Sequence, residues 1–441
     1  MVQLNLSKQR GSRIAAVHAR QVLDSRGRPT VEAEVTLEDG SCGLASVPSG
    51  ASMGKHEALE LRDRNVSVHG GFGVLTAIAN VRVEIATATI GLDALAQERL
   101  DEVLIALDGS DSLERLGSNA VLSTSLAVAR AAASHLNEPL YRYISRINKD
   151  SSMSLPMPMT NILSGGAHAS RGMDFQDFLV IPVGAESYSQ ALEMISRVRN
   201  CASELLLARG LPTLLADEGG LCPGFSRAEE SLKFLMEAIE RATLRPSQDV
   251  AIAIDVAASE LFRAGAYDLT AEGRQLTSME MMDFLKLLAR KYPIISIEDG
   301  LDQDDWAHWH LFTETLPDIQ IVGDDLFATN VSRIAQGIQK RVANATLIKL
   351  NQNGTLSGTL KAIAACKNAH YATIVSARSG ETEDTFIADF AVGTGAGQIK
   401  VGSVRNSERL AKYNQLSRIE ETSDLPFASV SGLGGSRYCQ Q

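Results

Sequence analysis

The sequence has few cysteines, little positive charge and no long apolar run, and each shortage excludes a class of protein. Its five cysteines are widely spaced and form no Cys-x-x-Cys pair, which excludes a zinc finger and predicts free or buried thiols. No apolar run approaches the roughly 20 residues of a membrane-spanning helix. The first residues also lack the apolar core of a secretory signal. These absences predict a cytoplasmic protein without a membrane span.

Positive charge is scarce, because 42 lysines and arginines stand against 53 aspartates and glutamates, for a formal net charge of -11. A nucleic-acid-binding surface needs clustered lysine and arginine, so nucleic acid is excluded as a partner. A small phosphorylated acid remains compatible, since a few local cations or a metal ion can hold one phosphate. The 441 residues allow more than one domain, or one large barrel with an addition.

The pattern of apolar residues changes along the chain and predicts two domains. Residues 14–24 and 30–40 alternate apolar and polar residues like half-buried strands, and residues 120–136 have the apolar period of a helix. A polar, proline-bounded stretch at 148–158 is typical of a linker. We predict an α+β domain over residues 1–140, a barrel domain over 141–430 and a flexible tail over 431–441.

Short apolar runs alternate with helical segments after the linker. The eight β-like runs are residues 178–183, 213–217, 250–255, 294–299, 319–325, 345–351, 372–378 and 397–402. Segments such as 356–370 between them have helical periodicity. This alternation predicts an α/β fold with an eight-stranded β/α (TIM-like) barrel, with an open doubly wound sheet as the alternative.

Charged residues stand at the carboxyl ends of most of these predicted strands. They are Asp217, Glu218, Asp255, Glu298, Asp324, Lys349, Arg378 and Lys400. In a barrel these ends meet at one mouth, where active sites are built. The placement therefore predicts an active site.

Three of the carboxylates are candidate metal ligands. Asp255, Glu298 and Asp324 offer hard oxygen atoms with no histidine or cysteine nearby in the sequence. Mg²⁺ prefers such oxygens and keeps some of its waters. The alternative is that each carboxylate only caps the helix that follows it.

The two strand-end lysines and one glutamate are candidates for proton transfer. A lysine beside a metal ion and another cation has a lowered pKa and can act as a base near neutral pH, which suits Lys349 and Lys400. Glu218 precedes two glycines and could be the opposing acid. The alternatives are solvated surface lysines and an ordinary turn.

An arginine and two serines are candidates for binding a phosphate or a metal. Arg378 offers a guanidinium fork and Ser379 a further donor for phosphate oxygens. Residues 49–55 are one residue short of the P-loop spacing, so a lid or metal-binding loop with Ser52 as ligand is the better interpretation. Together with the lysines, this set predicts proton abstraction next to a carboxylate followed by loss of a leaving group.

A lysine base beside Mg²⁺ that stabilises an enediolate is the established pattern of the enolase superfamily. The motifs that carry the likeness are VPSGAS, HEALELRD, GGAHA, DEGG, SIEDGL, GDDLF, RSGETEDTFIADFAVGTGAGQIK and AKYNQL. With them the sequence resembles the enolase (phosphopyruvate hydratase) family over nearly its whole length. The resemblance implies an N-terminal α+β domain capping an enolase-type barrel, and a homodimer. It also implies two Mg²⁺ sites, of which the second takes its ion together with the substrate.

The resemblance also implies a role for each matched residue. Asp255, Glu298 and Asp324 match the magnesium ligands, and Ser52 matches the lid residue that reaches the second magnesium. Lys349 matches the base that removes the C2 proton of 2-phosphoglycerate, and Glu218 the acid at the C3 hydroxyl. The residues that match substrate-binding positions are His168, Gln176, Asp177, Arg378, Ser379 and Lys400.

Four residues depart from the family pattern. Ala377 stands where the family has histidine, and Asp177 where it has glutamate. Ser164 replaces the usual asparagine, and Met53 the lid threonine. Loss of a positioned polar group commonly lowers a rate by about 10²–10⁴-fold. The departures therefore predict a slow enolase or a pocket remodelled for another substrate.

The resulting prediction is a Mg²⁺-dependent hydro-lyase that dehydrates 2-phosphoglycerate to phosphoenolpyruvate. One alternative is a paralogue that acts on a related phosphorylated or phosphonylated acid, as carboxyphosphonoenolpyruvate synthase does. Another is a non-catalytic binding protein that keeps the fold. A sugar-acid dehydratase is less favoured, because the enolase-like motifs extend well outside the site.

Overall fold

The computed structural model describes residues 11–50, 54–149, 152–169 and 172–429. Ser52, Met53 and the predicted tail at 431–441 lie outside the described residues. The chain divides into two compact units. The first unit is Met1–Met153, Lys349–Ile363 and Arg378–Gly395, and the second is Ser154–Ile348, Ala364–Ala377 and Ala396–Gln441. The predicted boundary at residue 140 stays a prediction.

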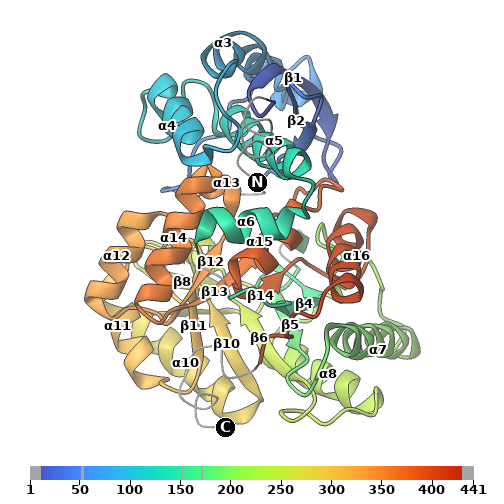
Figure 1. Cartoon of the computed structure of the whole chain (residues 1–441). Coiled ribbons are helices and arrows are strands. Elements are labelled where there is room, and N and C mark those ends of the chain that lie inside the picture. Colours follow the sequence, from blue (N-terminus) through green and yellow to red (C-terminus); the bar gives the residue numbers. More distant parts are fainter. Residues whose placement is uncertain (1–10, 51–53, 150–151, 170–171, 430–441) are drawn as a thin grey trace. The chain divides into compact units, whose positions relative to one another are not determined.

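The first unit contains a three-stranded antiparallel sheet in the order β1-β2-β3 (Figure 1). Its strands are β1 (Ile14–Leu23), β2 (Pro29–Leu37) and β3 (Cys42–Ser46). Along β2 every second residue is fully buried, so the alternation in the sequence correctly located this strand. The expected strand at 14–24 is confirmed as β1.

Helices cover this sheet, and α5 (Ser118–Leu136) is the longest of those described in the first unit. The others are η1 (His69–Gly71), α2 (Leu75–Asn80), η2 (Val81–Ile85), α3 (Ala86–Thr89), α4 (Gln97–Asp108), α6 (Leu140–Asn148), α13 (Leu350–Asn353), the first turns of α14 (Leu356–Asn368) and α15 (Phe386–Thr394). A Cβ atom at Gly43 of β3 would lie 2.0 Å from the carbonyl oxygen of Ala127. Only glycine therefore allows α5 to approach β3 this closely.

The second unit is built on a closed eight-stranded barrel in the order β10-β11-β12-β13-β14-β4-β5-β6 (Figure 1). The strands are β4 (Met157–Ser164), β5 (Asp177–Ile181), β6 (Ala251–Asp255), β10 (Ile294–Glu298), β11 (Gln320–Gly323), β12 (Ala345–Ile348), β13 (Ala372–Ser376) and β14 (Gly397–Lys400). Strand β5 is antiparallel to both β4 and β6, whereas the other barrel pairs are parallel. Closure confirms the predicted α/β barrel and excludes the open sheet.

Apolar side chains from alternate strand positions fill the barrel, among them Met159, Leu179, Val322 and Ile374. Helices lie around its outside (Figure 1): α7 (Tyr188–Ala208), α8 (Ala228–Arg241), α10 (Ser278–Lys291), α11 (Trp306–Thr315), α12 (Val331–Lys340) and α16 (Ser407–Thr422). The remaining elements are η3 (Gly166–Ala169), α9 (Ala258–Leu261) and a small sheet of β7 (Phe262–Arg263), β8 (Ala266–Leu269) and β9 (Arg274–Leu276). Within the described residues, no helix is long and apolar enough to cross a membrane.

Two predictions about the barrel strands were wrong. Residues 213–217 form no strand, only an isolated bridge between Leu215 and Leu221. The eighth strand is instead β4, which begins inside the predicted linker at 148–158. All eight residues of β4 are buried, so it shows no alternation, and the prolines at its start are typical of a linker.

Candidate active site

The amino group of Lys400 lies between two carboxylates at one end of the barrel. Lys400 is the last residue of β14, and its Nζ donates to Asp255 Oδ2 at 2.8 Å and to Glu298 Oε2 at 2.7 Å. All three side chains are buried. Burial alone lowers the pKa of Lys400, but Asp255 and Glu298 outweigh it and hold that pKa well above its usual value. The lowered pKa expected for Lys400 beside a metal ion is therefore not found in the chain without a metal ion.

Strand direction explains why these carboxylates meet. Asp255 and Glu298 are the last residues of the parallel strands β6 and β10 and are register partners. Asp177 is the first residue of β5, but β5 runs the opposite way, so Asp177 also pairs with Asp255. Gln176, just before β5, donates through Nε2 to Asp255 Oδ2 at 3.1 Å. The barrel thus gathers four of the expected site residues at one end.

Two of the residues that depart from the family pattern contact each other. Asp177 has no exposed surface, and its Oδ1 accepts from Ser164 Oγ at 3.0 Å and from the side-chain amide of Asn161. Ser164 and Asp177 are register partners across β4 and β5. Burial raises the pKa of Asp177, and the nearby His168 opposes this. Ser164 and Asp177 are therefore in direct contact, so exchanges at the two positions affect each other's surroundings.

His168 lies between two acids at the edge of this cluster. Its Nδ1 is 3.5 Å from Asp177 Oδ2, and its Nε2 is 3.8 Å from Glu218 Oε1. Burial lowers the pKa of His168, but the two carboxylates raise it to about 9. At neutral pH His168 is therefore a cation that can donate a hydrogen bond to a substrate oxygen or orient the carboxyl group of Glu218.

Glu218 does not stand at a strand end, as the sequence had predicted, but in a tight turn. Its carbonyl accepts from the Ser403 amide at 2.8 Å, which fixes the turn against the loop after β14. A Cβ at Gly220 would lie 2.3 Å from Asn161 Oδ1 and 2.4 Å from Ser164 Oγ. The two glycines of the DEGG motif thus let Glu218 reach the site, although no strand carries it.

A further acidic group follows β10 and β11. Ligand atoms of Asp299, Asp324 and Asp325 lie within 4.8 Å of one another. Asp299 accepts from the amides of Asp324 at 2.9 Å and Asp325 at 2.8 Å. Burial raises the pKa of Asp299, and the acidic neighbours add to this. Asp299 was not among the predicted site residues, although its place directly after Glu298 was a usable signal.

The donor set in the second unit fits Mg²⁺. Among the described residues, the acids around Lys400 offer only oxygen ligands, which Mg²⁺ prefers. Asp255, Glu298, Asp299 and Asp324 are all buried, and Lys400 supplies only one positive charge to them. A divalent cation would offset this excess of buried negative charge. The His168, Asp177 and Glu218 atoms also lie within 4.8 Å of one another.

The expected phosphate-binding residues belong to the first unit. Arg378 Nη1 donates to Glu57 Oε2 at 2.8 Å and to Asn351 Oδ1 at 3.3 Å. Ser379 Oγ accepts from Arg26 Nη1 at 3.2 Å. Both Arg378 and Ser379 are buried. The structure therefore places a second cation, Arg26, beside Ser379. Arg26 was not predicted from the sequence, because it lies 353 residues from Ser379 in the chain.

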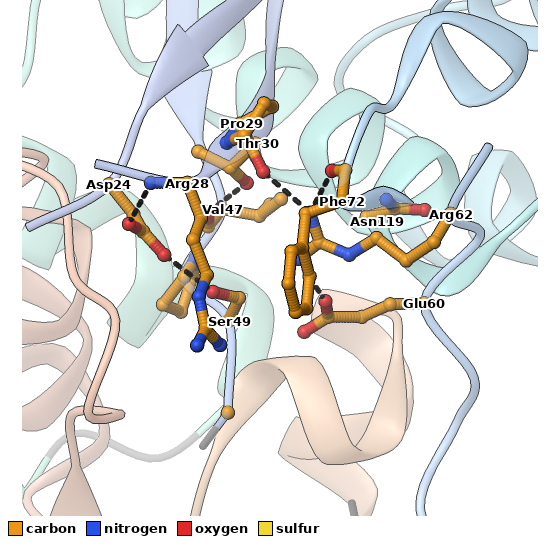
Figure 2. Close-up of polar contacts among 12 residues, drawn as sticks. Asp24, Arg28, Pro29, Thr30, Val47, Ser49, Glu60, Arg62, Phe72 and Asn119 are labelled. Atoms are coloured by element: carbon orange, nitrogen blue, oxygen red, sulfur yellow. Dashed lines mark hydrogen bonds and ion pairs between the residues drawn. The ribbon is translucent and has the colours of Figure 1, made fainter. Parts of the chain in front are cut away.

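Asp24 fixes the turn that carries Arg26. Its Oδ1 accepts from the amide of Arg28 at 2.9 Å, and its Oδ2 accepts from Ser49 Oγ at 2.8 Å (Figure 2). The same Oδ1 accepts from the amide of Arg26 at 2.9 Å. Arg26 in turn donates through Nη2 to Ser49 Oγ at 2.7 Å. The first unit thus holds Arg26, Ser49 and Ser379 in one hydrogen-bonded group.

Lys349 and Ala377 follow barrel strands directly in the chain. Lys349 comes after the last residue of β12 and precedes α13. Ala377 follows β13, is 6% exposed, and its amide donates to the carbonyl of Lys400 at 2.9 Å. This bond joins backbone atoms only, so it does not depend on the side chain at position 377.

Comparison with protein families agrees with this architecture. The model of the enolase C-terminal TIM barrel domain matches residues 152–430, and that of the enolase N-terminal domain matches residues 14–144. The chain belongs to the enolase family. This membership confirms the resemblance and supports a lyase or another enolase-superfamily function.

Proposed function

We propose that this enolase-family chain is a Mg²⁺-dependent hydro-lyase that converts 2-phosphoglycerate to phosphoenolpyruvate. The observation that carries the proposal is the buried Lys400 between Asp255 and Glu298 at the carboxyl ends of β14, β6 and β10. Burying charged groups costs desolvation free energy that their attraction often does not repay, so stability alone does not explain this cluster, whereas a functional role does. A cationic, acid-rich strand-end site suits a substrate that carries a carboxylate and also binds a metal ion.

Asp255, Glu298 and Asp324 would hold the magnesium ion, with Ser52 as the proposed ligand of a second ion. When bound, Mg²⁺ would supply positive charge that stabilises the additional negative charge on the substrate carboxylate. Lys400 would bind that same carboxylate. Its contacts with Asp255 and Glu298 support a cation that helps to bind the substrate.

Lys349 would remove the C2 proton and Glu218 would protonate the departing C3 hydroxyl. His168 supports the second role, because a cation 3.8 Å from Glu218 can orient its carboxyl group and bind the same hydroxyl. Gln176 would help to order Asp255 in the pocket. Arg378 and Ser379 would bind the phosphate. A homodimer stays a prediction from the family, and a cytoplasmic location stays a prediction from the sequence.

Turnover in the presence of Mg²⁺ tests the proposal. The purified chain is mixed with 2-phosphoglycerate, and the ultraviolet absorbance of the enolpyruvate product is followed. We expect a turnover of roughly 1–10³ per second, lost on adding a chelator and restored by Mg²⁺. No product, with Mg²⁺ and substrate still bound in calorimetry, would reject 2-phosphoglycerate as the substrate. Failure to bind either would favour a non-catalytic enolase-fold protein.

A related phosphorylated or phosphonylated acid is the second candidate substrate, and the changed pocket residues favour it. Ala377 removes a polar side chain, and Asp177 with Ser164 shortens the acid beside His168. If the pocket serves another acid, the double variant Ala377→His and Asp177→Glu should raise kcat/KM for 2-phosphoglycerate by about 10²–10⁴-fold.

The two exchanges are best measured singly, together and with Ser164→Asn. The longer side chain in Asp177→Glu would crowd Ser164 and Asn161, which contact Asp177. We therefore expect Asp177→Glu to give its full increase in kcat/KM only when residue 164 is also changed. Asp174→Glu, in the same segment, is the matched control, because its carboxylate accepts from the amides of Ala271 and Glu272, outside the contact between Ser164 and Asp177. Additive effects of the 164 and 177 exchanges would contradict their coupling.

A further inference from the structure

Glu57 holds three groups of the first unit with one buried carboxylate. Its Oε2 accepts from Arg378 Nη1 at 2.8 Å, in an ion pair whose side chains are both 7% exposed. Its Oε1 accepts from Gln352 Nε2 at 3.2 Å and from the amide of Gly54 at 3.1 Å. Every oxygen of this carboxylate is thus used within the first unit.

The partners of Glu57 are residues next to proposed functional groups. Arg378 is the proposed phosphate ligand, and its amide is held by Glu381 Oε1 at 3.0 Å. Asn351 shares Arg378 Nη1 with Glu57 at 3.3 Å. Asn351 and Gln352 both lie in α13, which begins directly after Lys349. Glu57 therefore connects the arginine to the helix that follows the proposed base.

A second contact fixes the same helix to the segment that carries Glu57. The amide of Ala58 donates to the carbonyl of Gln352 at 2.9 Å. The Glu57 side chain and the adjacent backbone thus hold Gln352 at both its amide group and its carbonyl. A guanidinium held at one nitrogen loses less rotational freedom when it binds an oxyanion, because its direction is already set.

We propose that Glu57 is a positioning residue that orients Arg378 toward a substrate oxyanion and fixes α13 behind Lys349. The inference rests on the proposed function for the roles of Arg378 and Lys349. Glu57 itself touches neither the substrate nor the metal in this proposal. A buried ion pair is weak evidence for stability, since apolar residues can often replace it. An orienting role explains why a charged pair stands at this place.

The variants Glu57→Gln and Glu57→Asp test the inference, with Glu60→Gln as the matched control. Glu60 lies in the same segment and pairs with Arg62 at 2.6 Å, and Arg62 also donates to the carbonyls of Pro29 and Phe72 (Figure 2). Glu60→Gln therefore removes an ion pair of the same segment without changing Arg378. Binding of inorganic phosphate is measured by calorimetry, and KM and kcat for 2-phosphoglycerate by absorbance.

Glu57→Gln should weaken phosphate binding and raise KM by roughly 10- to 100-fold, because the hydrogen bond to Arg378 loses the negative charge that strengthens it. Glu57→Asp should restore part of the affinity, and Glu60→Gln should leave both values near those of the unchanged chain. Thermal unfolding of each variant separates an orienting effect from loss of the fold. If Glu57→Gln does not fold, Glu57→Asp alone decides the matter, with an expected change in KM larger than that in kcat.

Two results would overturn the inference while leaving the proposed function intact. Unchanged KM and phosphate affinity in a folded Glu57→Gln chain would show that Glu57 does not orient Arg378. Tighter phosphate binding would show that Glu57 competes with the anion for the guanidinium. If the unchanged chain neither converts 2-phosphoglycerate nor binds phosphate, the proposed function fails, and the inference that rests on it fails too.

Discussion

Replacing Lys349 by alanine should lower kcat for 2-phosphoglycerate by about 10²–10⁴-fold, because a positioned general base contributes that much to a rate. Substrate affinity should change little, since the proposed carboxylate and phosphate ligands are other residues. Lys349 is only partly buried, so the variant should unfold at nearly the same temperature. Turnover at saturating substrate and Mg²⁺ measures the effect.

Exchange of the C2 hydrogen with heavy water separates the base from the acid. Lys349→Ala should lose both exchange and product, whereas Glu218→Gln should keep exchange and lose product, because Glu218 acts only on the leaving hydroxyl. Lys361→Ala is the control, since Lys361 is an exposed lysine that pairs with Glu98. Full exchange in Lys349→Ala would assign the proton transfer to another residue.

Replacing Lys400 by methionine should destabilise the chain by about 3–5 kcal/mol, the usual cost of removing one partner of a buried ion pair. Asp255 and Glu298 would then be two buried carboxylates without the ammonium that lies between them. The free energy of unfolding in urea, without metal, measures this loss. Mg²⁺ should recover part of the lost stability, because its charge can replace that of the lysine.

A partly buried lysine outside the site provides the comparison for this variant. Lys286 pairs with Asp283 on the surface of α10, and Lys286→Met should cost at most about 1 kcal/mol. If Lys400→Met proves as stable as Lys286→Met, the two carboxylates are not held as charged groups. Equal stability with and without Mg²⁺ in Lys400→Met would contradict metal binding at Asp255 and Glu298.

The strand-end residues were predictable because a barrel strand has a pattern that is visible in a short stretch of sequence. A short apolar run that ends in a charged residue is visible at Asp255, Glu298 and Lys400, and each is the last residue of its strand. Parallel strands bring such ends together, whatever the details of the packing. The roles of Asp324 and Lys349 follow from the same rule and stay predictions until the variants are measured.

The misses have a common physical cause. Strand β4 is buried on every residue, so it carries no period of two. Glu218 reaches its place through a turn that packs against Ser403 and Asn161, which are distant in the sequence. Arg26 and Glu57 were missed because their partners Ser379 and Arg378 are more than 300 residues away. Contacts at such separations leave no local pattern in a single sequence.

The sequence by itself determined the barrel, the enolase family and the chemical types of the site, because periodicity and motif spacing are properties of short segments. Only the tertiary structure decided which side chains meet. It joined Ser164 to Asp177, set Lys400 between two acids, and grouped the segments after Lys349 and Arg378 with the first unit. These contacts depend on strand register, which exists only in the folded chain. Burial and neighbouring charges, which shift a pKa, also arise only on folding.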